Sequence, residues 1–259
     1  MTDPDLLELA VLVELHIGRE QLGPGSEAST ERAFGLLPAD LPLGTGARIL
    51  DLGCGTGRQT LTLARLAPGA TILGVERMPP MAAFANERIA AAGLAPRVGV
   101  REGSMIDDAL IAERASLIWS EGAIYNVGVE AGLRAWSGYL VSGGCVAFTE
   151  VSWLGEVRPA AARRFWQAAY PLMRSVDENL AIIAACGYVS LAHFTLPASD
   201  WWSYYDHLEP SYRVLREKYA ARPDALAALE SQRAEQDVYR AYSDAYGYEF
   251  YLARLPVSD

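Results

Sequence analysis

The chain has 259 residues, of which 51% are hydrophobic and 21% are charged. This composition predicts one generous α/β domain, alone or with an accessory subdomain, and it excludes wholesale disorder. The formal net charge is −10, from 32 acidic and 22 basic side chains. Such a charge disfavours nucleic acid as a partner, because phosphate binding depends on Lys and Arg, and the densest basic stretch is only Arg158 with Arg163 and Arg164.

Cysteine usage and the N-terminus predict a soluble, cytoplasmic protein. The three cysteines are an odd number and stand far apart, at Cys54, Cys145 and Cys186, so neither a disulfide framework nor a zinc-binding CxxC pair is expected. The N-terminus is acidic where a secretory signal is basic. The apolar stretch 6–17 contains two glutamates and is shorter than the roughly 20 residues that a membrane span needs.

The first 45 residues are predicted to form two helices ahead of the main domain. Apolar residues recur at helical spacing over 6–17, which indicates an amphipathic helix that ends near Gly18. A second helix, capped by Ser26 or Ser29, is expected to run through residue 37. We therefore divide the chain into N-terminal helices, residues 1–45, and a main domain, residues 46–259.

From residue 46 onward, short apolar strands alternate with helices. Strands are predicted over 47–52, 71–75, 98–102, 117–120 and 146–150, with helices between them over 58–66, 80–92 and 130–140. This alternation is typical of a doubly wound parallel sheet with right-handed crossovers. Beyond it we expect helices over 160–170 and 176–185, a strand over 188–196, an aromatic-rich helical stretch over 201–242 and a last strand over 248–255.

The most informative motif is a glycine-rich turn directly after the first strand. Its residues are Asp51-Leu52-Gly53-Cys54-Gly55-Thr56-Gly57. Glycines let the backbone approach a ligand closely, and the helix that follows presents its free N–H groups. A dinucleotide-binding fingerprint would place its third glycine at position 58, where Arg58 stands instead. Glu76 ends the second strand, where a carboxylate can accept hydrogen bonds from both hydroxyls of a ribose.

This GxGxG turn, with Asp51 two residues before it, resembles motif I of the class I S-adenosylmethionine-dependent methyltransferases. Gly103-Ser104-Met105 resembles the adenine-contacting turn of the same families. Further blocks look like those of bacterial small-molecule methyltransferases related to the quinone-biosynthesis type: Gly23–Ser26, Trp119–Asn126, Ser152-Trp153, Arg158-Pro159 and Phe165-Trp166. The likeness covers residues 15–200 and leaves the insert at 200–245 unmatched.

The resemblance implies both a fold and a cofactor. The fold is a doubly wound α/β arrangement with a mostly parallel seven-stranded sheet, an antiparallel edge hairpin, an N-terminal helical lid and a helical insert before the last strand. The cofactor is S-adenosylmethionine, which leaves as S-adenosylhomocysteine, and no metal is expected. The cofactor-binding residues that the resemblance implies are Asp51, Gly53, Cys54, Gly55, Thr56, Gly57, Gln59, Glu76, Arg77, Ser104, Met105 and Ser120.

Methyl transfer is an in-line displacement, in which aligning the acceptor and excluding water supply much of the rate gain. Glu121 follows the fourth strand at the ligand-binding edge and Tyr125 lies one helical turn later, so both are catalytic candidates, as a base or a substrate contact. The alternatives are that Glu121 caps the loop and that Tyr125 packs in the lid. Glu150 and Trp153, at and after the end of the fifth strand, are candidate walls for the acceptor.

The three histidines lack the spacing of metal ligands, and His16 and His193 are expected to be structural. His207 follows an aromatic cluster at 201–205 and is a candidate for lining the acceptor pocket. That cluster either packs the insert onto the sheet, which we favour, or forms a cage for a cationic amine acceptor.

Two other functions are kept as alternatives. A nicotinamide-dependent oxidoreductase also binds a ribose at a strand-end carboxylate, but the third glycine is missing and Tyr139 is followed at the YxxxK position by Gly143. A non-catalytic adenosyl-cofactor-binding protein is the second alternative. The expected partner is a small-molecule substrate, with no nucleic acid and no membrane. The acceptor, the methylated atom (O, N, C or S) and a homodimeric state are left open.

Overall fold

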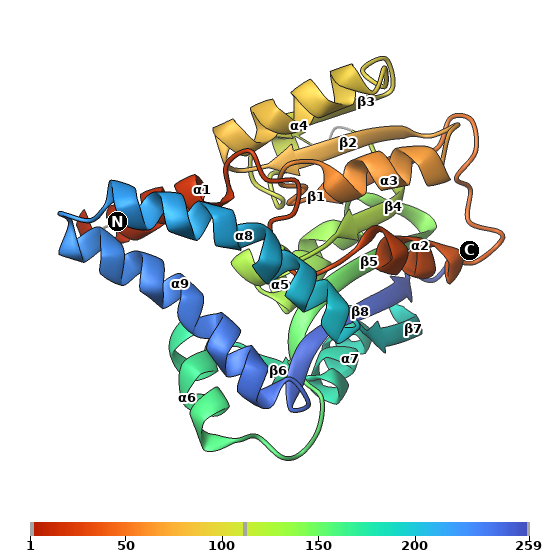
Figure 1. Cartoon of the computed structure of the whole chain (residues 1–259). Coiled ribbons are helices and arrows are strands. Elements are labelled where there is room, and N and C mark those ends of the chain that lie inside the picture. The colour runs from red at the N-terminus through yellow and green to blue at the C-terminus, as the bar shows by residue number, and fades with distance from the viewer. Residues whose placement is uncertain (1–2, 111–112, 258–259) are drawn as a thin grey trace.

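An eight-stranded sheet runs through the computed structural model, which describes residues 3–110 and 113–257 (Figure 1). Seven strands lie side by side in the order β3-β2-β1-β4-β5-β8-β7. Their bounds are β1 (Arg48–Leu52), β2 (Thr71–Glu76), β3 (Val98–Glu102), β4 (Ala115–Ser120), β5 (Leu140–Trp153), β7 (Val189–Thr195) and β8 (Tyr246–Arg254). The eighth strand, β6 (Arg174–Ser175), pairs with the end of β5.

The directions of the strands confirm the predicted mostly parallel sheet. The pairs of β1 with β2 and β4, of β2 with β3, and of β4 with β5 are all parallel. Strand β8 is antiparallel to both of its neighbours, β5 and β7, and forms the predicted antiparallel edge with β7. Strand β5 is longer than predicted because its pairing with β8 continues without interruption from Cys145 to Trp153.

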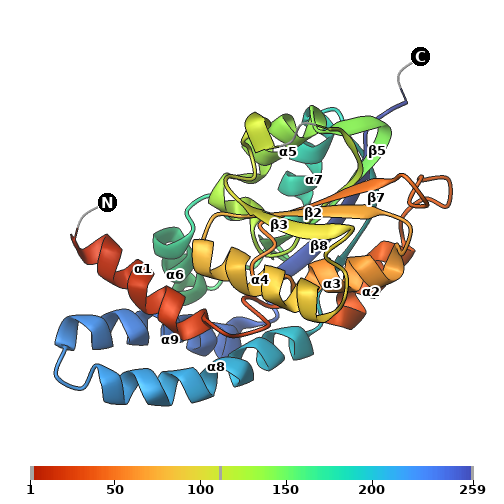
Figure 2. The ribbon, with the colours of Figure 1, turned by 90° about the horizontal axis from the view of Figure 1, so that it is seen from above.

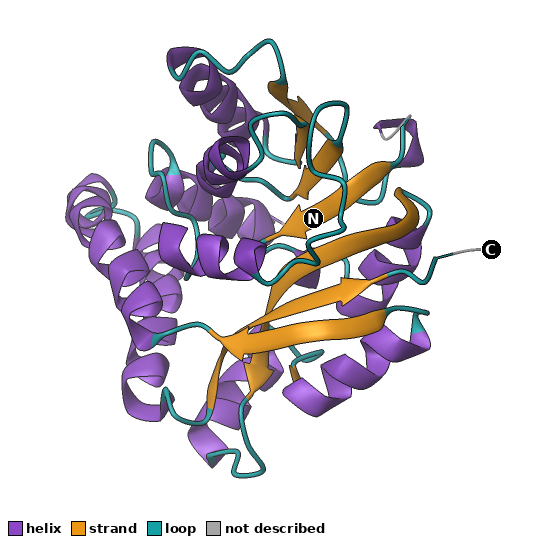
Figure 3. Ribbon diagram, turned by 90° about the vertical axis from the view of Figure 1, so that its right-hand side faces the viewer, coloured by secondary structure: helices purple, strands orange, loops and turns teal. Residues whose placement is uncertain are grey.

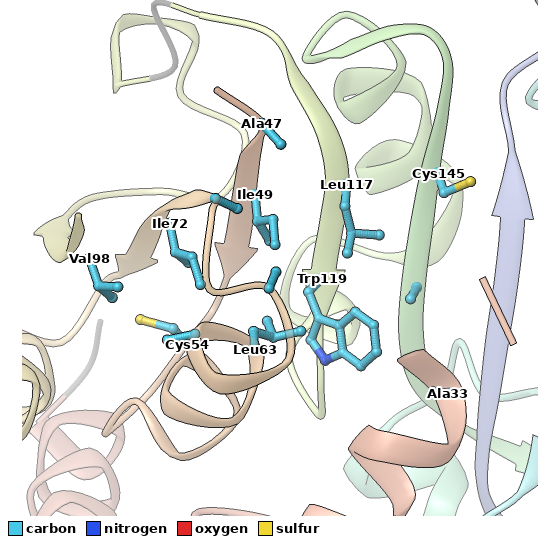
Figure 4. Close-up of a cluster of buried hydrophobic side chains, with 14 of the residues drawn as sticks. Ala33, Ala47, Ile49, Cys54, Leu63, Ile72, Val98, Leu117, Trp119 and Cys145 are labelled. Carbon is cyan, nitrogen blue, oxygen red and sulfur yellow. The ribbon is translucent and has the colours of Figure 1, made fainter. Parts of the chain in front are cut away.

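Helices cover both faces of the sheet (Figure 3). On one face, Ile49, Leu117 and Trp119 pack under α2 (Glu27–Gly35), α3 (Arg58–Leu66) and α4 (Pro79–Ala91) in a buried cluster (Figure 4). On the other face, Leu50 and Ile118 pack under α5 (Val129–Ser137) and α7 (Val176–Ala185). Neighbouring residues of a strand point to opposite faces, so parallel strands covered on both sides are apolar throughout.

Three further helices gather at one end of the molecule (Figures 1 and 2): α1 (Asp3–His16), α8 (Ala198–Lys218) and α9 (Pro223–Tyr242). Val11 and Leu15 of α1 pack with Leu208 of α8 and Leu229 of α9 in a cluster of their own. The N-terminal helix therefore packs on the helical insert that precedes the last strand.

The aromatic residues of the insert pack it onto the sheet, which is the role that we favoured for the cluster at 201–205. Trp201 is fully buried and stacks on Tyr239 of α9, with ring centroids 4.2 Å apart. The ring of Trp201 also meets Tyr246 at the start of β8, and α6 (Ala160–Ala169) adds Trp166 to the same cluster. Two short 3-10 helices, η1 (Asp108–Leu110) and η2 (Ile124–Asn126), complete the described elements.

All three cysteines are free thiols, and Cys54 and Cys145 are buried. Within the described ranges, no helix is both long and apolar enough to cross a membrane. The same part of the chain places no group of three or more His, Cys, Asp or Glu side chains where it could hold a metal ion.

Candidate cofactor and acceptor site

The glycine-rich turn after β1 is folded so tightly that two of its glycines have no room for a side chain. Gly53 and Gly55 have φ values of 76° and 56°, in the left-handed region. A Cβ atom on Gly53 would lie 2.3 Å from Cβ of Ala123, and one on Gly55 would lie 2.6 Å from Cδ1 of Leu22. The turn is therefore enclosed by the loop after β4 on one side and by the N-terminal segment on the other.

Asp51 supports this turn from below. Its buried carboxylate accepts a hydrogen bond from the hydroxyl of Thr60 and lies 3.4 Å from Nε2 of Gln59. Burial raises the pKa of Asp51 to about 7, because desolvation disfavours the charged form. Asp51 does not line the cavity described next, so its contacts hold the start of α3 against β1.

A cavity of about 420 Å³ opens at the carboxyl ends of the central strands. This is the edge at which open α/β sheets bind ligands. The predicted cofactor residues that line it are Gly53, Cys54, Gly55, Thr56, Gln59, Glu76, Arg77, Ser104 and Met105. Two others do not line it: Gly57 is the N-cap of α3, and the hydroxyl of Ser120 donates to the carbonyl of Leu52 at 2.7 Å.

The carboxylate of Glu76 enters the cavity from the end of β2 in a fixed orientation. Its Oε2 accepts a hydrogen bond from the amide of Gly55 at 3.0 Å, and its Oε1 accepts one from the amide of Met78 at 2.8 Å. Each carboxylate oxygen can accept more than one hydrogen bond, so both retain capacity for a ligand. Two fixed acceptor oxygens suit the two hydroxyls of a ribose.

The segment between α1 and α2 covers the glycine turn. The hydroxyl of Thr56 donates to the carbonyl of Glu20 at 2.9 Å. Arg88 of α4 fastens the same contact, because it donates to the carbonyl of Thr56 at 2.9 Å and lies 3.4 Å from the carboxylate of Glu20. The segment contributes four residues to the cavity lining: Glu20, Leu22, Gly23 and Pro24.

Glu121 lines the cavity with a carboxylate that already has three donors. Its Oε1 accepts from the hydroxyl of Thr30 at 2.7 Å and from Nε1 of Trp119 at 2.8 Å, and its Oε2 pairs with Arg58 at 3.1 Å. The side chain of Glu121 is only 4% exposed. These contacts match the alternative in which Glu121 holds the loop, and they leave little capacity for a general base.

Arg58 is a cavity residue that the sequence patterns did not identify. In the sequence, Arg58 stands at the position of the third glycine of a dinucleotide fingerprint, which argues against that fingerprint but assigns Arg58 no role. Its guanidinium stands at the first position of α3 and lines the cavity while it pairs with Glu121. A cation directly after the glycine turn was the signal that could have revealed it.

Tyr125, the second catalytic candidate, also lines the cavity. It belongs to η2 and meets the ring of Tyr170 edge-on, with centroids 6.0 Å apart. Three candidates for the acceptor wall do not line the cavity: Glu150, Trp153 and His207. Glu150 and Trp153 are buried in the packing of β5, whereas His207 is exposed on α8.

Another part of the cavity wall comes from α1, α8, α9 and β8. His16, predicted to be structural, lines the cavity and connects two of these helices, since its Nε2 lies 2.9 Å from the hydroxyl of Tyr204. Its Nδ1 lies 2.8 Å from the carbonyl of Leu12, which can only accept, so Nδ1 carries a proton. In the neutral ring, Nε2 then accepts from the hydroxyl of Tyr204. Burial lowers the pKa of His16 and favours this neutral form.

Glu235 of α9 and Tyr248 of β8 complete this wall, and neither was predicted. The hydroxyl of Tyr205 donates to Oε1 of Glu235 at 2.9 Å, and burial raises the pKa of the Glu235 carboxyl. The sequence held no signal for this part of the cavity, because its residues meet only when helices from the two ends of the chain pack together.

The strand order, the glycine turn after β1 and the carboxylate at the end of β2 define the class I, Rossmann-like methyltransferase fold. The structure is similar to that of an S-adenosylmethionine-dependent methyltransferase from Geobacter sulfurreducens in complex with S-adenosyl-L-homocysteine, and the similarity covers 94% of this chain. The TM-score is 0.78, with 21% sequence identity and 97% of the other chain covered. At that identity the likeness shows the fold alone.

Residues 49–144 match the methyltransferase domain family, in agreement with the glycine-rich motif that lies within this range. A demethylmenaquinone methyltransferase from Thermus thermophilus is 36% identical over 92 residues, which are 36% of this chain and 37% of that protein. A magnesium-protoporphyrin O-methyltransferase from Rhodobacter capsulatus is 31% identical over 153 residues, covering 56% of this chain and 66% of the relative. The match thus spans less than two thirds of either relative.

Proposed function

We propose that the chain transfers a methyl group from S-adenosylmethionine to a small-molecule acceptor. The observation that carries this proposal is that one cavity joins the glycine turn and Glu76 to a wall of aromatic and polar side chains. A cofactor and an acceptor bound in one cavity are held close together, as an in-line displacement requires.

The cavity suits the parts of S-adenosylmethionine. Glu76 offers two fixed oxygens to the ribose hydroxyls, and Ser104 with Met105 lies beside the expected place of the adenine. Gly53 and Gly55 let the turn that lines the cavity pack closely against Ala123 and Leu22, and Arg58 supplies a cation for the carboxylate of the methionine part. When bound, the cofactor supplies a methyl group made electrophilic by its positively charged sulfur.

The residues of the chain then act by binding, orienting and excluding water. Glu121 positions Arg58 and α2 around the cavity, and the covering segment keeps water from the glycine turn through the contact of Thr56 with Glu20. Under this proposal Glu121 is a positioning residue, and Tyr125, which also lines the cavity, contacts the acceptor.

The proposal extends to partners and location. A net charge of −10 and a cavity of about 420 Å³ favour a small acceptor over nucleic acid. Three free thiols suit the reducing cytoplasm. Size-exclusion chromatography with light scattering distinguishes a monomer from a homodimer, which the cavity does not require.

Calorimetric titration with S-adenosylmethionine, S-adenosylhomocysteine and NADH in parallel tests the cofactor. We expect micromolar binding of the two adenosyl compounds and none of NADH. Absence of adenosyl binding, also with a panel of small amines, phenols and thiols present, would overturn the proposal. If the cofactor binds but no labelled methyl group reaches any member of the panel, the non-catalytic cofactor-binding alternative is favoured.

A further inference from the structure

Four residues from different elements line one part of the cavity, where burial, helped by the charge of Glu235, raises the pKa of each of the three tyrosines. Its aromatic walls are Tyr125 of η2, Tyr204 of α8 and Tyr248 of β8, and its carboxylate is Glu235 of α9. We call these four residues the acceptor chamber. The chamber is built by elements outside the glycine turn and the ends of β1 and β2, where the cofactor is proposed to bind.

The three tyrosine rings are held by neighbours outside the chamber. Tyr125 meets Tyr170 edge-on at 6.0 Å, and Tyr248 packs against Trp201 with centroids 5.2 Å apart. The hydroxyl of Tyr204 is fixed by its bond to His16. Rings fixed in this way keep their positions when a ligand arrives, so they form a preorganised aromatic surface.

The carboxylate of the chamber has no positive partner. Among the described residues Glu235 forms no ion pair, and its carboxylate accepts a hydrogen bond from the hydroxyl of Tyr205 at 2.9 Å. Of the two arginines that line the cavity, Arg58 pairs with Glu121 and Arg77 is exposed at the end of β2. His16 lies in the same wall, but burial lowers the pKa of its imidazole and so disfavours a positive charge there.

An enclosed carboxylate without a cation is costly, and a bound cation removes that cost. The pKa of Tyr204 is raised mainly by burial and also by the negative charge of Glu235. The tyrosines therefore stay neutral at physiological pH. Neutral aromatic faces around one carboxylate attract a positive, partly apolar group.

We infer that the acceptor chamber binds a small aliphatic amine in its cationic form, with an N–H group toward Glu235 and its alkyl groups against the tyrosine rings. This inference rests on the proposed function, because it names the acceptor class of the same site. It selects nitrogen as the methylated atom and assigns the chamber a different role from the packing role of Trp201.

Methylation of such an acceptor balances with the proposed cofactor alone. The ammonium group passes its N–H proton to the carboxylate of Glu235, which frees the nitrogen lone pair. That lone pair forms the new N–C bond, the C–S bond of the methyl donor breaks, and its electron pair remains on sulfur. The products are a methylated ammonium ion and S-adenosylhomocysteine, with the proton on Glu235 until solvent removes it.

Binding of matched amine and hydrocarbon probes tests the inference without requiring turnover. Each of a panel of small tertiary and secondary amines is paired with its carbon isostere, for example N,N-dimethylethanolamine with 3-methylbutan-1-ol. Affinities are measured by calorimetry with S-adenosylhomocysteine at saturation. We expect at least one amine to bind at least about tenfold more tightly than its isostere, as a desolvated ion pair with cation–π contacts requires.

Variants then assign the preference to the chamber. We expect E235Q to remove it and to leave the affinity for S-adenosylhomocysteine unchanged. The matched control is E230Q on the same helix, because Glu230 is half-exposed and pairs with Arg216 outside the cavity. A second pair of variants keeps the test valid if E235Q misfolds. Y125L should weaken amine binding several-fold, whereas Y125F keeps the aromatic ring and should bind the amine as the unaltered protein does.

The outcomes separate this inference from the proposed function. Equal affinity for amines and isosteres, or an amine preference that survives in E235Q, overturns the inference while the cofactor still binds. If the unaltered protein does not bind S-adenosylhomocysteine, the proposed function itself is overturned.

Discussion

Thr30 and Glu121 are 91 positions apart in the sequence, yet the hydroxyl of Thr30 donates to Oε1 of Glu121 at 2.7 Å. This contact joins α2 to the loop after β4 at the edge of the cavity. Because Trp119 and Arg58 donate to the same carboxylate, one side chain fixes the relative positions of α2, β4 and α3.

Replacing Glu121 tests whether it acts as an anchor. We expect E121Q to keep cofactor affinity, to lose turnover and to lower the thermal midpoint of unfolding. The reason is that the amide nitrogen of Gln cannot accept a hydrogen bond, whereas both oxygens of Glu121 accept from donors. In a double-mutant cycle with T30V, the interaction energy in the free energy of unfolding should be about 1–2 kcal/mol. If E121Q loses turnover while its thermal midpoint is unchanged, and if the E121Q and T30V effects on the free energy of unfolding simply add, Glu121 is a general base instead.

Glu76 is expected to contribute to cofactor affinity and little to the fold. E76A should weaken the binding of S-adenosylmethionine by about 10- to 100-fold, because a ribose diol loses its fixed acceptors. The matched control is E102A, since Glu102 ends the adjacent strand β3 in register with Glu76 but lies outside the cavity lining. An unchanged affinity in E76A, measured by calorimetry, would remove Glu76 from the site.

The clash at Gly55 predicts that a single methyl group disturbs the covering segment. In G55A the new Cβ would lie 2.6 Å from Leu22, so we expect cofactor affinity to fall by at least about tenfold as the segment shifts. The variant G93A is the control, because Gly93 also has a positive φ, of 70°, but no atom within 4 Å of the added Cβ. If L22A fails to recover part of the affinity in the G55A background, the clash is not the cause.

Glu150 predicts how stability depends on pH. Burial raises the pKa of its carboxyl from 4.5 to about 8, so between these values the folded protein keeps a proton that the unfolded chain has released. The free energy of unfolding therefore falls as pH rises through this window, by at most about 1.4 kcal/mol per pH unit for this one group.

We expect E150Q to flatten that fall, measured as urea unfolding at several pH values from about 5 to about 8. Asp51, whose pKa is raised to about 7, contributes a decline of its own, so D51N with E150Q should be flatter still. The control is E156Q, because Glu156 is exposed. A pH dependence that is the same in E150Q and the unaltered protein would contradict a buried, proton-binding Glu150.

The central strands and the glycine turn were predictable because their signals are local. The run from Ile49 to Leu52 is buried on both faces and apolar except for Asp51, and glycines follow it where the φ values are positive. The two-residue β6 and the full length of β5 were not predictable. Both depend on what the neighbouring strand offers, as in the pairing of Trp153 with Ser175 and with Tyr246.

Polar residues at strand ends show where local reasoning stops. Glu76 and Asp51 both lie at or next to the end of a predicted strand near the glycine turn, but Glu76 lines the cavity whereas Asp51 bonds to Thr60 in the core. Which way such a carboxylate turns depends on donors brought by other elements. The chamber around Glu235 was hidden for a stronger reason, since α1, α8 and α9 meet only in the folded chain.

The wall of the cavity includes one helix, α1, that packs chiefly on other helices. It contributes Leu12, Val13 and His16 to the lining and contacts α8 and α9 through apolar side chains. Lifting α1 would break the bond of His16 to Tyr204 and the apolar packing around Leu15, but no strand pairing. Ligand exchange can thus be governed by the undocking of 14 residues, at a free-energy cost set separately from that of unfolding the sheet.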